Sequence, residues 1–351
     1  MKGEIKALKI LLALYIFLCL LIAGLNYGLA PHVSEAGSRI IRSIWNIYEN
    51  YFKTFLIVTG SWLTLRISGK RSRMQKRNFA GFIIAALLVH IIGPFLTGNP
   101  DLYFFAMPFP WSSTALQTLV DRSSFYTHHL PLWGLGGISA SLTVYLIITI
   151  IVFTGTVLLG RRWQCSTLCL FNGFISETFS PAFPLVGKKT APGSKLRKLF
   201  VVLKWALLVI AFIFFLFWFY ILISGDYRES AADLFADIEV YKYLSVELLM
   251  AMFFWVAFTG RGYCYYCPLG TVLGWVSRLA GQRIRTDISD CIKCGKCNVS
   301  CPMGIEIKMS AEEKKDVYSS LCVGCGHCVD ICPVGTLEYS TAFLGKIRRG
   351  K

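Results

Sequence analysis

The sequence has few charged residues. Of its 351 residues, 16% are Asp, Glu, Lys or Arg, and 55% are hydrophobic. Soluble domains carry about 25% charged residues, so lipid rather than water is expected to surround most of this chain. The sequence also lacks a P-loop, a nucleotide-binding glycine pattern and a hydrolase nucleophile motif. No signal therefore points to nucleotide or hydrolase chemistry.

Histidine, methionine and acidic residues are also scarce. Of five His, only His90 falls inside an apolar stretch, which argues against a haem held by two histidines within a helical bundle. The seven Met form no cluster, so a copper path is disfavoured. Asp and Glu number 20 against 36 Lys and Arg, a net charge of +16. No basic stripe with exposed aromatics accompanies this charge, so no nucleic-acid partner is expected.

Apolar stretches long enough to cross a bilayer as helices dominate the first 260 residues. They are residues 8–30, 51–67, 79–97, 139–160, 198–224 and 241–260. The stretch 51–67 is the weakest, because Lys53 and Arg66 bound a short apolar core. The first stretch follows a basic N-terminus as a signal peptide does, but it is long for one, and we expect an uncleaved helix.

Charges in the connecting loops predict the orientation. Residues 66–77 and 161–198 each carry a charge of +6, whereas residues 225–240 carry −4. Cytoplasmic loops are enriched in Lys and Arg, so the two basic loops are expected inside and the segments 31–49, 98–138 and 225–240 outside. Six spans then put both termini in the cytoplasm. Residues 1–260 are predicted to form an all-α transmembrane bundle of about six helices in the cell membrane.

The motif C-x2-C-x2-C-x3-C-P occurs twice near the C-terminus, at 291–302 and 322–333. Disulfides are rare in the cytoplasm, and a structural zinc site usually uses separated cysteine pairs. In this motif three thiolates hold one [4Fe–4S] cluster and the cysteine before proline ligates the other. We predict cluster A on Cys291, Cys294, Cys297 and Cys332. We predict cluster B on Cys322, Cys325, Cys328 and Cys301.

These motifs define a small C-terminal domain. Residues 285–340 are predicted to form an α+β dicluster domain like bacterial ferredoxins, between a membrane-surface linker at 261–284 and a basic tail at 341–351. Gly295, Gly324 and Gly326 suit tight turns around the clusters. His327 is predicted to be an exposed loop side chain rather than a ligand.

Four further cysteines lie in two loops that leave the membrane on the same side. "GRRWQCSTLCLFNG" (160–173) contains Cys165 and Cys169, and "GRGYCYYCPLG" (260–270) contains Cys264 and Cys267. These four thiols could hold a third iron–sulfur cluster, and the nearby Arg161, Arg162 and Arg261 suit an anionic thiolate site. The alternative is that they are helix-end cysteines that never meet. Cys19, alone in the first helix, is expected to be a packing residue.

Together these features resemble the NapH/NosR-type membrane ferredoxins over most of residues 79–340. The resemblance implies a quinol dehydrogenase-like redox subunit that passes electrons between the quinone pool and a reductase system, often through partner proteins. The family pattern in both membrane loops is C-x3-C-P. Here Leu170 replaces the proline after Cys169, and the spacing from Cys264 to Cys267 is one residue shorter. No outer loop has room for the flavin domain of the NosR branch, so the NapH branch is the closer match.

His90 and Glu247 are candidates for a quinol and proton site, because ionisable residues within spans are rare and usually functional. The alternative is a structural pair or two unrelated side chains. The loop 98–138, rich in Phe and Trp and containing His128 and His129, is expected to cover the helix ends at the membrane interface. It could also dock an outer-face redox partner subunit or form part of a quinol pocket.

The predicted function is electron transfer between the quinone pool or a membrane partner and a cytoplasmic electron donor or acceptor. Two [4Fe–4S] clusters, with a third as a candidate, would carry the electrons. Two alternatives remain open, namely a non-enzymatic membrane anchor for a catalytic partner and a metallocofactor assembly factor.

Overall fold

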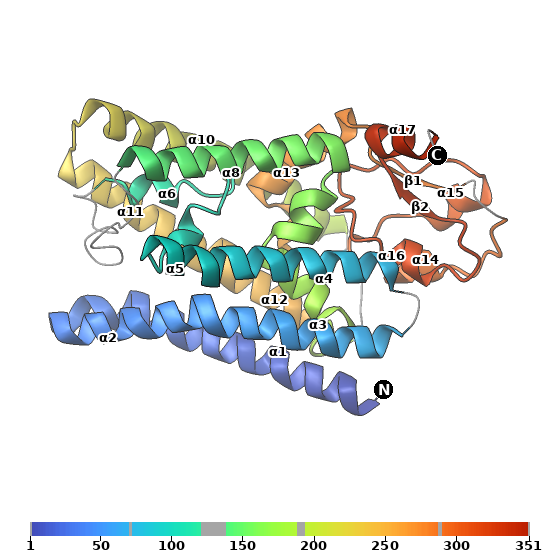
Figure 1. Ribbon diagram of the computed structural model, residues 1–351, viewed down its shortest axis with the longest axis horizontal. Coiled ribbons are helices and arrows are strands. Elements are labelled where there is room, and N and C mark those ends of the chain that lie inside the picture. The colour runs from blue at the N-terminus through green and yellow to red at the C-terminus, as the bar shows by residue number, and fades with distance from the viewer. Residues whose placement is uncertain (1, 70–71, 121–137, 188–193, 287–289, 350–351) are drawn as a thin grey trace.

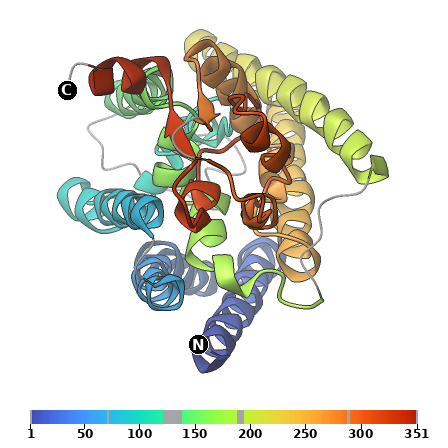
Figure 2. The ribbon, with the colours of Figure 1, turned by 90° about the vertical axis from the view of Figure 1, so that its right-hand side faces the viewer.

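The computed structural model describes residues 2–69, 72–120, 138–187, 194–286 and 290–349. It has two parts, a long bundle of helices and a smaller C-terminal module at one end of the bundle (Figure 1). The N-terminus and the C-terminus both lie at the module's end (Figure 1). Seen from that end, the module lies over the centre of the bundle (Figure 2). His128 and His129 lie outside the described residues.

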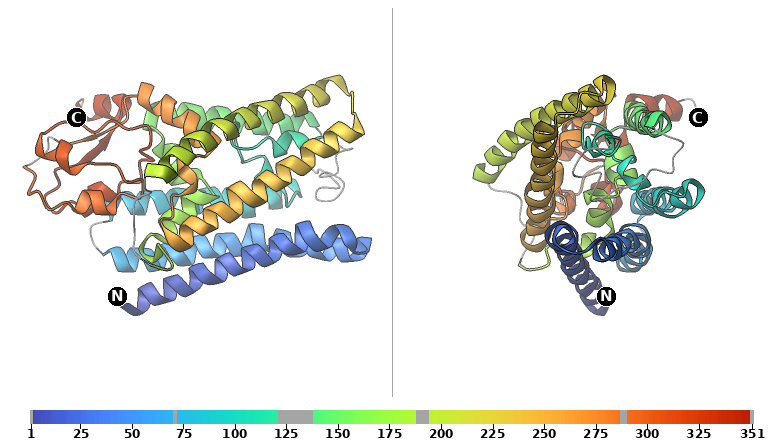
Figure 3. Two further views of the ribbon diagram at one scale, coloured as in Figure 1. Left: turned by 180° about the vertical axis from the view of Figure 1, so that it is seen from behind. Right: turned by 90° about the vertical axis from the view of Figure 1, so that its left-hand side faces the viewer.

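The helices of the bundle run along its length (Figures 1 and 3). They are α1 (Lys2–Ala23), α2 (Glu35–Asn46), α3 (Lys53–Ser68), α4 (Arg73–Ala86), α8 (Ile138–Leu159), α10 (Ser194–Ser224), α11 (Glu229–Lys242) and α12 (Met250–Ala257). In the described part of the chain, five helical runs are long and apolar enough to cross a membrane. They are Gly3–His32, Arg73–Thr97, Ile138–Leu159, Lys195–Ser224 and Glu229–Ala257. Five of the six predicted spans thus coincide with helices that could cross a membrane.

The predicted span 51–67 is not one of the five. It forms α3, which continues α2 through residues Ile47–Phe52 as one helix from Glu35 to Ser68. This helix lies beside α1 and α4 (Figure 1). Its low apolar content follows from Lys53, Arg66 and several small polar side chains in a short core. That it crosses the membrane stays a prediction.

Four of the long helices contain a wider, π-helical turn. These turns are Gly24–Leu29, Ile47–Phe52, Leu87–Ile92 and Tyr243–Leu249. Each turn carries at least one buried polar side chain, and the set is Asn26, Glu49, Asn50, His90 and Glu247. Single π-helical turns often occur at functional sites. A functional site is therefore expected in the middle of the bundle.

Short elements close the two ends of the bundle. In the half away from the module lie α5 (Gly93–Thr97) and α6 (Thr114–Gln117) (Figure 1). Toward the module lie α9 (Asn172–Thr178) and α13 (Pro268–Leu279), and α13 occupies much of the predicted linker.

The C-terminal module combines a small sheet with short helices. Strands β1 (Arg283–Arg285) and β2 (Glu338–Ser340) pair antiparallel, with Ile284 opposite Tyr339. Helices α14 (Lys296–Ser300) and α16 (His327–Ile331) follow the two cysteine turns and pack against each other. Helix α15 (Lys308–Glu312) lies between the motifs, and α17 (Ala342–Arg349) occupies the basic tail.

Candidate iron–sulfur sites and membrane cavity

The eight cysteines of the C-terminal motifs surround two small cavities, each of about 20 Å³. Each motif contributes three cysteines to one cavity and its last cysteine to the other. One cavity is lined by Cys291, Cys294, Cys297 and Cys332. The other is lined by Cys322, Cys325, Cys328 and Cys301. Each predicted set of four thiols therefore encloses one space, as a cubic cluster with four thiolate ligands requires.

The turns between these cysteines depend on glycine, and this prediction is confirmed. Three glycines have positive φ values, and they are Gly295 (69°), Gly324 (68°) and Gly326 (81°). Two backbone N–H groups donate to sulfur at 3.4 Å, that of Lys293 to Cys291 Sγ and that of Ile305 to Cys301 Sγ. Hydrogen bonds to sulfur are one way in which a protein sets a cluster's reduction potential.

The loop at 320–325 faces the rest of the chain. Cys325 and Cys328 are buried, whereas Cys294 in the other motif is exposed. Four side chains from outside the motif donate to carbonyl groups of this loop. They are Arg161 to Ser320 (2.9 Å), Gln282 to Cys322 (2.8 Å), Ser166 to Val323 (2.8 Å) and Asn78 to Cys325 (2.9 Å). The site predicted for cluster B thus lies against the bundle, and the site predicted for cluster A lies toward solvent.

Two further contacts fix the module on the bundle. A Cβ atom added to Gly324 would lie 2.5 Å from Arg162 Cβ, so the two backbones approach as closely as glycine permits. Arg162 itself donates to Asn78 Oδ1 at 2.9 Å rather than to a thiol. The carboxylate of Asp330 accepts the backbone N–H of Met74 at 3.0 Å, in the first turn of α4. A carboxylate here satisfies a free N–H and interacts favourably with the helix dipole.

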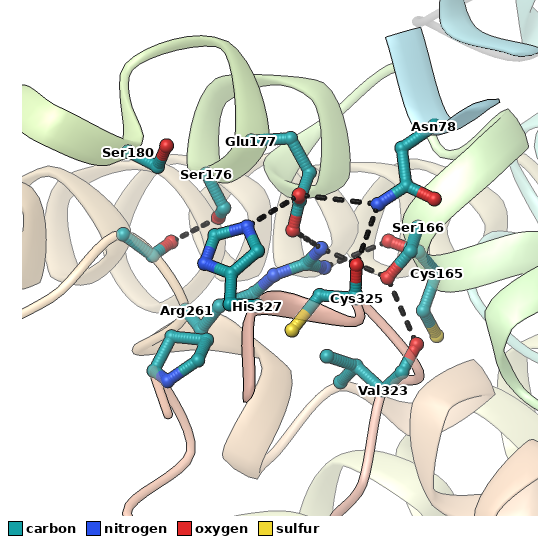
Figure 4. Close-up of polar contacts among 12 residues, drawn as sticks. Asn78, Cys165, Ser166, Ser176, Glu177, Ser180, Arg261, Val323, Cys325 and His327 are labelled. Atoms are coloured by element: carbon teal, nitrogen blue, oxygen red, sulfur yellow. Dashed lines mark hydrogen bonds and ion pairs between the residues drawn. The ribbon is translucent and has the colours of Figure 1, made fainter. Parts of the chain in front are cut away.

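Glu177 on α9 connects three segments (Figure 4). It is completely buried, and its Oε1 lies 2.5 Å from Arg261 Nη2 while its Oε2 lies 2.8 Å from His327 Nε2. Burial raises the pKa of Glu177, but the positive charges of His327 and Arg261 outweigh burial and lower it to about 2. The prediction that His327 is exposed is wrong, because its side chain turns toward Glu177 and is 14% exposed.

One group of three potential ligand atoms lies close together in the described part of the chain. Two sulfurs on one zinc can be no farther apart than twice the Zn–S bond, or about 4.6 Å. Across the described ranges, the one set of three ligand atoms within 4.8 Å of one another is Glu177, Cys325 and His327. Arg261 already neutralises that carboxylate, so a cation has little to gain there. No three cysteine sulfurs among the described residues lie within 4.8 Å of one another.

The two membrane loops with cysteine pairs are bound to each other by their arginines. Arg161 donates to Cys165 Sγ at 3.3 Å in its own loop and to the carbonyl of Cys264 at 3.1 Å in the other. Arg261 does the reverse, with Nη1 2.7 Å from the carbonyl oxygen of Cys165 and 3.7 Å from Cys264 Sγ. Both guanidinium groups are buried. Each arginine therefore contacts one cysteine of each loop.

All four loop thiols lie in one neighbourhood. Burial raises the pKa of Cys267, the N–H of Gly270 partly offsets this, and negative charge on Cys165, Cys264 and Cys169 raises it further. Burial likewise raises the pKa of Cys169 to about 11. Buried thiols with raised pKa values stay neutral unless a metal replaces the proton. Cys169 and Cys267 are therefore expected to keep their protons when no metal is bound.

A cavity of about 270 Å³ lies inside the bundle, and both His90 and Glu247 line it. Its wall is mostly aromatic and aliphatic, and on one side includes Phe171. Phe171 packs edge-on against Tyr263, with 5.2 Å between ring centroids, and Tyr263 directly precedes Cys264. The cavity therefore reaches the first cysteine loop directly, because Gln164, Leu168 and Leu170 also line it.

His90 and Glu247 do not act as a bonded pair. His90 Nδ1 lies 3.3 Å from Asn50 Oδ1, and the His90 ring stacks on Tyr103. Glu247 instead accepts a hydrogen bond of 2.8 Å from Lys242 Nζ. The structure places both predicted residues at the same cavity, each with a different partner.

Sequence reasoning missed four ionisable residues at this cavity and one outside it. The four are Glu49, Lys53, Glu239 and Lys242. Charge within or at the end of an apolar helix is the signal that could reveal the four residues, although in the sequence Lys53 only bounds a weak span. Glu177 is one acid in a basic loop, and no local pattern points to its buried contacts.

Comparison with known proteins identifies the module. Residues 284–339 match a family model described as a 4Fe-4S dicluster domain. The module is a 4Fe–4S dicluster domain. The chain is also 34% identical over 76 residues to "Putative electron transport protein YccM" of Escherichia coli (strain K12), a match that covers 21% of this chain and 20% of that protein. The dicluster domain accounts for the iron–sulfur character predicted from the cysteines.

A longer match covers part of the bundle. The chain is 25% identical over 189 residues to "Uncharacterized protein MJ0750" of Methanocaldococcus jannaschii, covering 52% of this chain and 72% of that protein. The chain spans only a fifth of YccM's length, so YccM's activity as a whole does not transfer to it. No solved structure matches the chain.

Proposed function

We propose that the protein relays electrons between a quinol bound in the membrane cavity and a cytoplasmic redox partner. The observation that carries this proposal is the cavity itself, which His90 and Glu247 line and which reaches the first cysteine loop at Gln164 and Leu168. The dicluster domain and the similarity to a protein named for electron transport support the relay. Such a protein would act as a quinol dehydrogenase-like subunit of the NapH type.

Twelve cysteines would hold three clusters along this route. In the dicluster domain, each set of four thiols around one cavity would hold one [4Fe–4S] cluster, with the ligands crossed between the motifs. Cys165, Cys169, Cys264 and Cys267 would hold a third cluster at the membrane surface. Two buried guanidinium groups, those of Arg161 and Arg261, support this third site because they offset the charge of thiolate ligands. When bound, clusters of this kind accept and release one electron at a time.

The order of the sites follows from their burial. The four-thiol site in the membrane loops lies next to the cavity wall, cluster B's site is held against the bundle, and cluster A's site includes the exposed Cys294. Electrons would leave or enter at cluster A, where a soluble partner can approach. With the dicluster domain in the cytoplasm, the opposite end of the bundle would face outward, where a second membrane or outer-face partner could bind.

Quinol-driven reduction of the purified protein tests this function. Wild-type protein mixed with a short-chain quinol should reduce its clusters, which bleaches their visible absorbance. Glu247→Gln keeps the side chain's shape but removes the proton acceptor, so the rate should fall about 100-fold. His90→Ala should also slow it, whereas dithionite should reduce the clusters of both variants normally.

Asp237→Asn is the matched control, because Asp237 is an exposed acid on the helix that leads to Glu247. This variant should react like wild type. Unchanged quinol-driven rates in both Glu247→Gln and His90→Ala would rule out the cavity as the quinol site. An anchor or an assembly factor predicts no quinol-driven reduction even by the wild-type protein.

A further inference from the structure

Three ionisable side chains form a row at the wall of the cavity. Glu247 accepts a hydrogen bond of 2.8 Å from Lys242, and Glu239 precedes Lys242 by three residues on α11, which brings the two side chains to the same face of the helix. All three residues line the cavity. Glu239 and Glu247 are buried, and the Lys242 side chain is only 12% exposed.

The charges of this row do not balance. Two carboxylates share the single ammonium of Lys242, so the row carries one uncompensated negative charge when both acids are ionised. The other ion pair at the cavity, Glu49 with Lys53, has one charge of each sign. An unbalanced buried charge is costly in a medium of low polarity. One added proton removes this imbalance. A proton added to the Glu49–Lys53 pair would instead create an imbalance, so the row is the better proton acceptor.

Glu239 continues the row away from the dicluster domain. Its Oε1 accepts hydrogen bonds from Ser113 Oγ at 2.9 Å and from Thr114 Oγ1 at 3.4 Å, and its Oε2 accepts one from Trp218 Nε1 at 3.2 Å. The Thr114 hydroxyl also accepts a hydrogen bond of 2.8 Å from Ser112. These hydroxyl groups begin α6, in the half of the bundle away from the dicluster domain (Figure 1).

A separate observation indicates that the cavity takes a ligand with a hydroxyl group. Asn50 Nδ2 donates to the carbonyl of Pro100 at 2.8 Å, so Asn50 Oδ1 is the atom that faces His90. His90 Nδ1 must then carry the proton, which leaves Nε2 as an acceptor. Nε2 is buried and has no hydrogen-bond partner among the described residues, although the His90 side chain lines the cavity. A quinol O–H group would satisfy it.

We infer that Glu247, Lys242 and Glu239 form a proton path that carries protons from the cavity toward the end of the bundle opposite the dicluster domain. This inference rests on the proposed quinol site and assigns Glu239 and Lys242 as positioning and relay residues. Oxidation of one quinol breaks two O–H bonds and releases two protons and two electrons. The electrons leave singly to the iron–sulfur clusters. One proton goes to Glu247 and the other to His90 Nε2.

Glu239→Gln tests the inference, because it balances the charge of the row without touching Glu247. The quinol-driven rate of cluster reduction should fall about tenfold or more, with a larger effect of deuterated solvent on the rate. Binding of a redox-inactive quinone analogue, measured by calorimetry, should change by less than about threefold, since hydrogen bonds at the cavity's other side remain. Infrared difference spectra should show loss of the carboxyl signal that appears when wild-type protein takes up the proton.

Two further variants make the outcome decisive. Glu239→Asp keeps the charge and should restore much of the rate, which a merely structural role for Glu239 would not predict. Asp237→Asn again serves as the exposed control on the same helix. A wild-type rate, solvent effect and infrared spectrum in Glu239→Gln would overturn the proton path while leaving the quinol site intact. Absence of quinol-driven reduction in wild-type protein would instead overturn the proposed function, on which the path rests.

Discussion

Arg261 and Glu177 form an ion pair of 2.5 Å from which solvent is excluded on both sides. Arg261 belongs to the membrane loop with Cys264, and Glu177 belongs to α9. The same carboxylate binds His327 of the dicluster domain, and the same guanidinium donates to Ser166 at 3.1 Å. Ser166 in turn donates to the carbonyl of Val323. One buried ion pair therefore links the cysteine loops of the membrane part to the loop predicted to hold cluster B.

Glu177→Gln should destabilise this junction. The variant removes the charged partner closest to the buried Arg261 guanidinium, and removing one partner of a buried ion pair costs about 3–5 kcal/mol. The dicluster domain should then separate from the bundle at lower temperature, measured by limited proteolysis across a temperature series. Glu313→Gln is the control, because Glu313 forms an exposed ion pair with Lys315 whose loss should cost about 1 kcal/mol or less. Equal proteolysis of both variants would show that Glu177 does not stabilise the contact between the dicluster domain and the bundle.

Asp330→Ala should weaken the start of α4. The variant removes the acceptor for the Met74 N–H and for that of Gln75, both at 3.0 Å. Loss of such a cap costs about 0.5–2 kcal/mol. Asp330→Asn keeps an acceptor and should lie close to wild type in the same thermal unfolding measurement. If the alanine and asparagine variants unfold together, Asp330 does not act as a cap.

Iron analysis of anaerobically purified protein should count the clusters. The dicluster domain should bind about eight irons per chain, and a filled site in the membrane loops should raise this to about twelve. Equal amounts of acid-labile sulfide should accompany the iron. Zinc in place of iron, or fewer than about six irons at full occupancy, would refute the cluster assignment.

The double variant Cys165→Ser/Cys267→Ser should lose one cluster. It removes one thiol from each membrane loop, and the eight thiols of the dicluster domain stay in place. One electron paramagnetic resonance signal should disappear while two remain, with about four fewer irons per chain. Cys19→Ala, which removes a buried cysteine of α1, should leave spectra and iron content unchanged. Wild-type spectra in the double variant would show that the loop cysteines are structural.

Local sequence spacing was enough to predict which four cysteines line each small cavity of the dicluster domain. The dicluster motif determines its own turns, so the positive φ values of its glycines could be foreseen from a dozen residues. Arg161 and Arg261 could also be foreseen beside the loop thiols, because each lies three or four residues from a cysteine in sequence. Arg162, which was expected to act beside the same thiols, donates instead to Asn78.

Residues whose partners lie far away in sequence could not be predicted. Glu177 meets His327 across 150 positions, which is why a histidine expected to be exposed is mostly covered. Glu239 accepts a hydrogen bond from Ser113, which lies 126 positions earlier in the sequence. The helix at 51–67 is a different case, because its apolar core is too short for composition to decide whether it crosses the membrane.

The contact between Asp330 and α4 also bears on how the protein is made. The helix start at Met74 and its cap are 256 positions apart, so α4 leaves the ribosome long before Asp330 is synthesised. The same delay applies to Asn78, whose partner Cys325 comes 247 positions later. The contacts at that end of the bundle can therefore form only after the dicluster domain has been made. A chain whose dicluster domain fails to fold leaves the first turn of α4 without its cap.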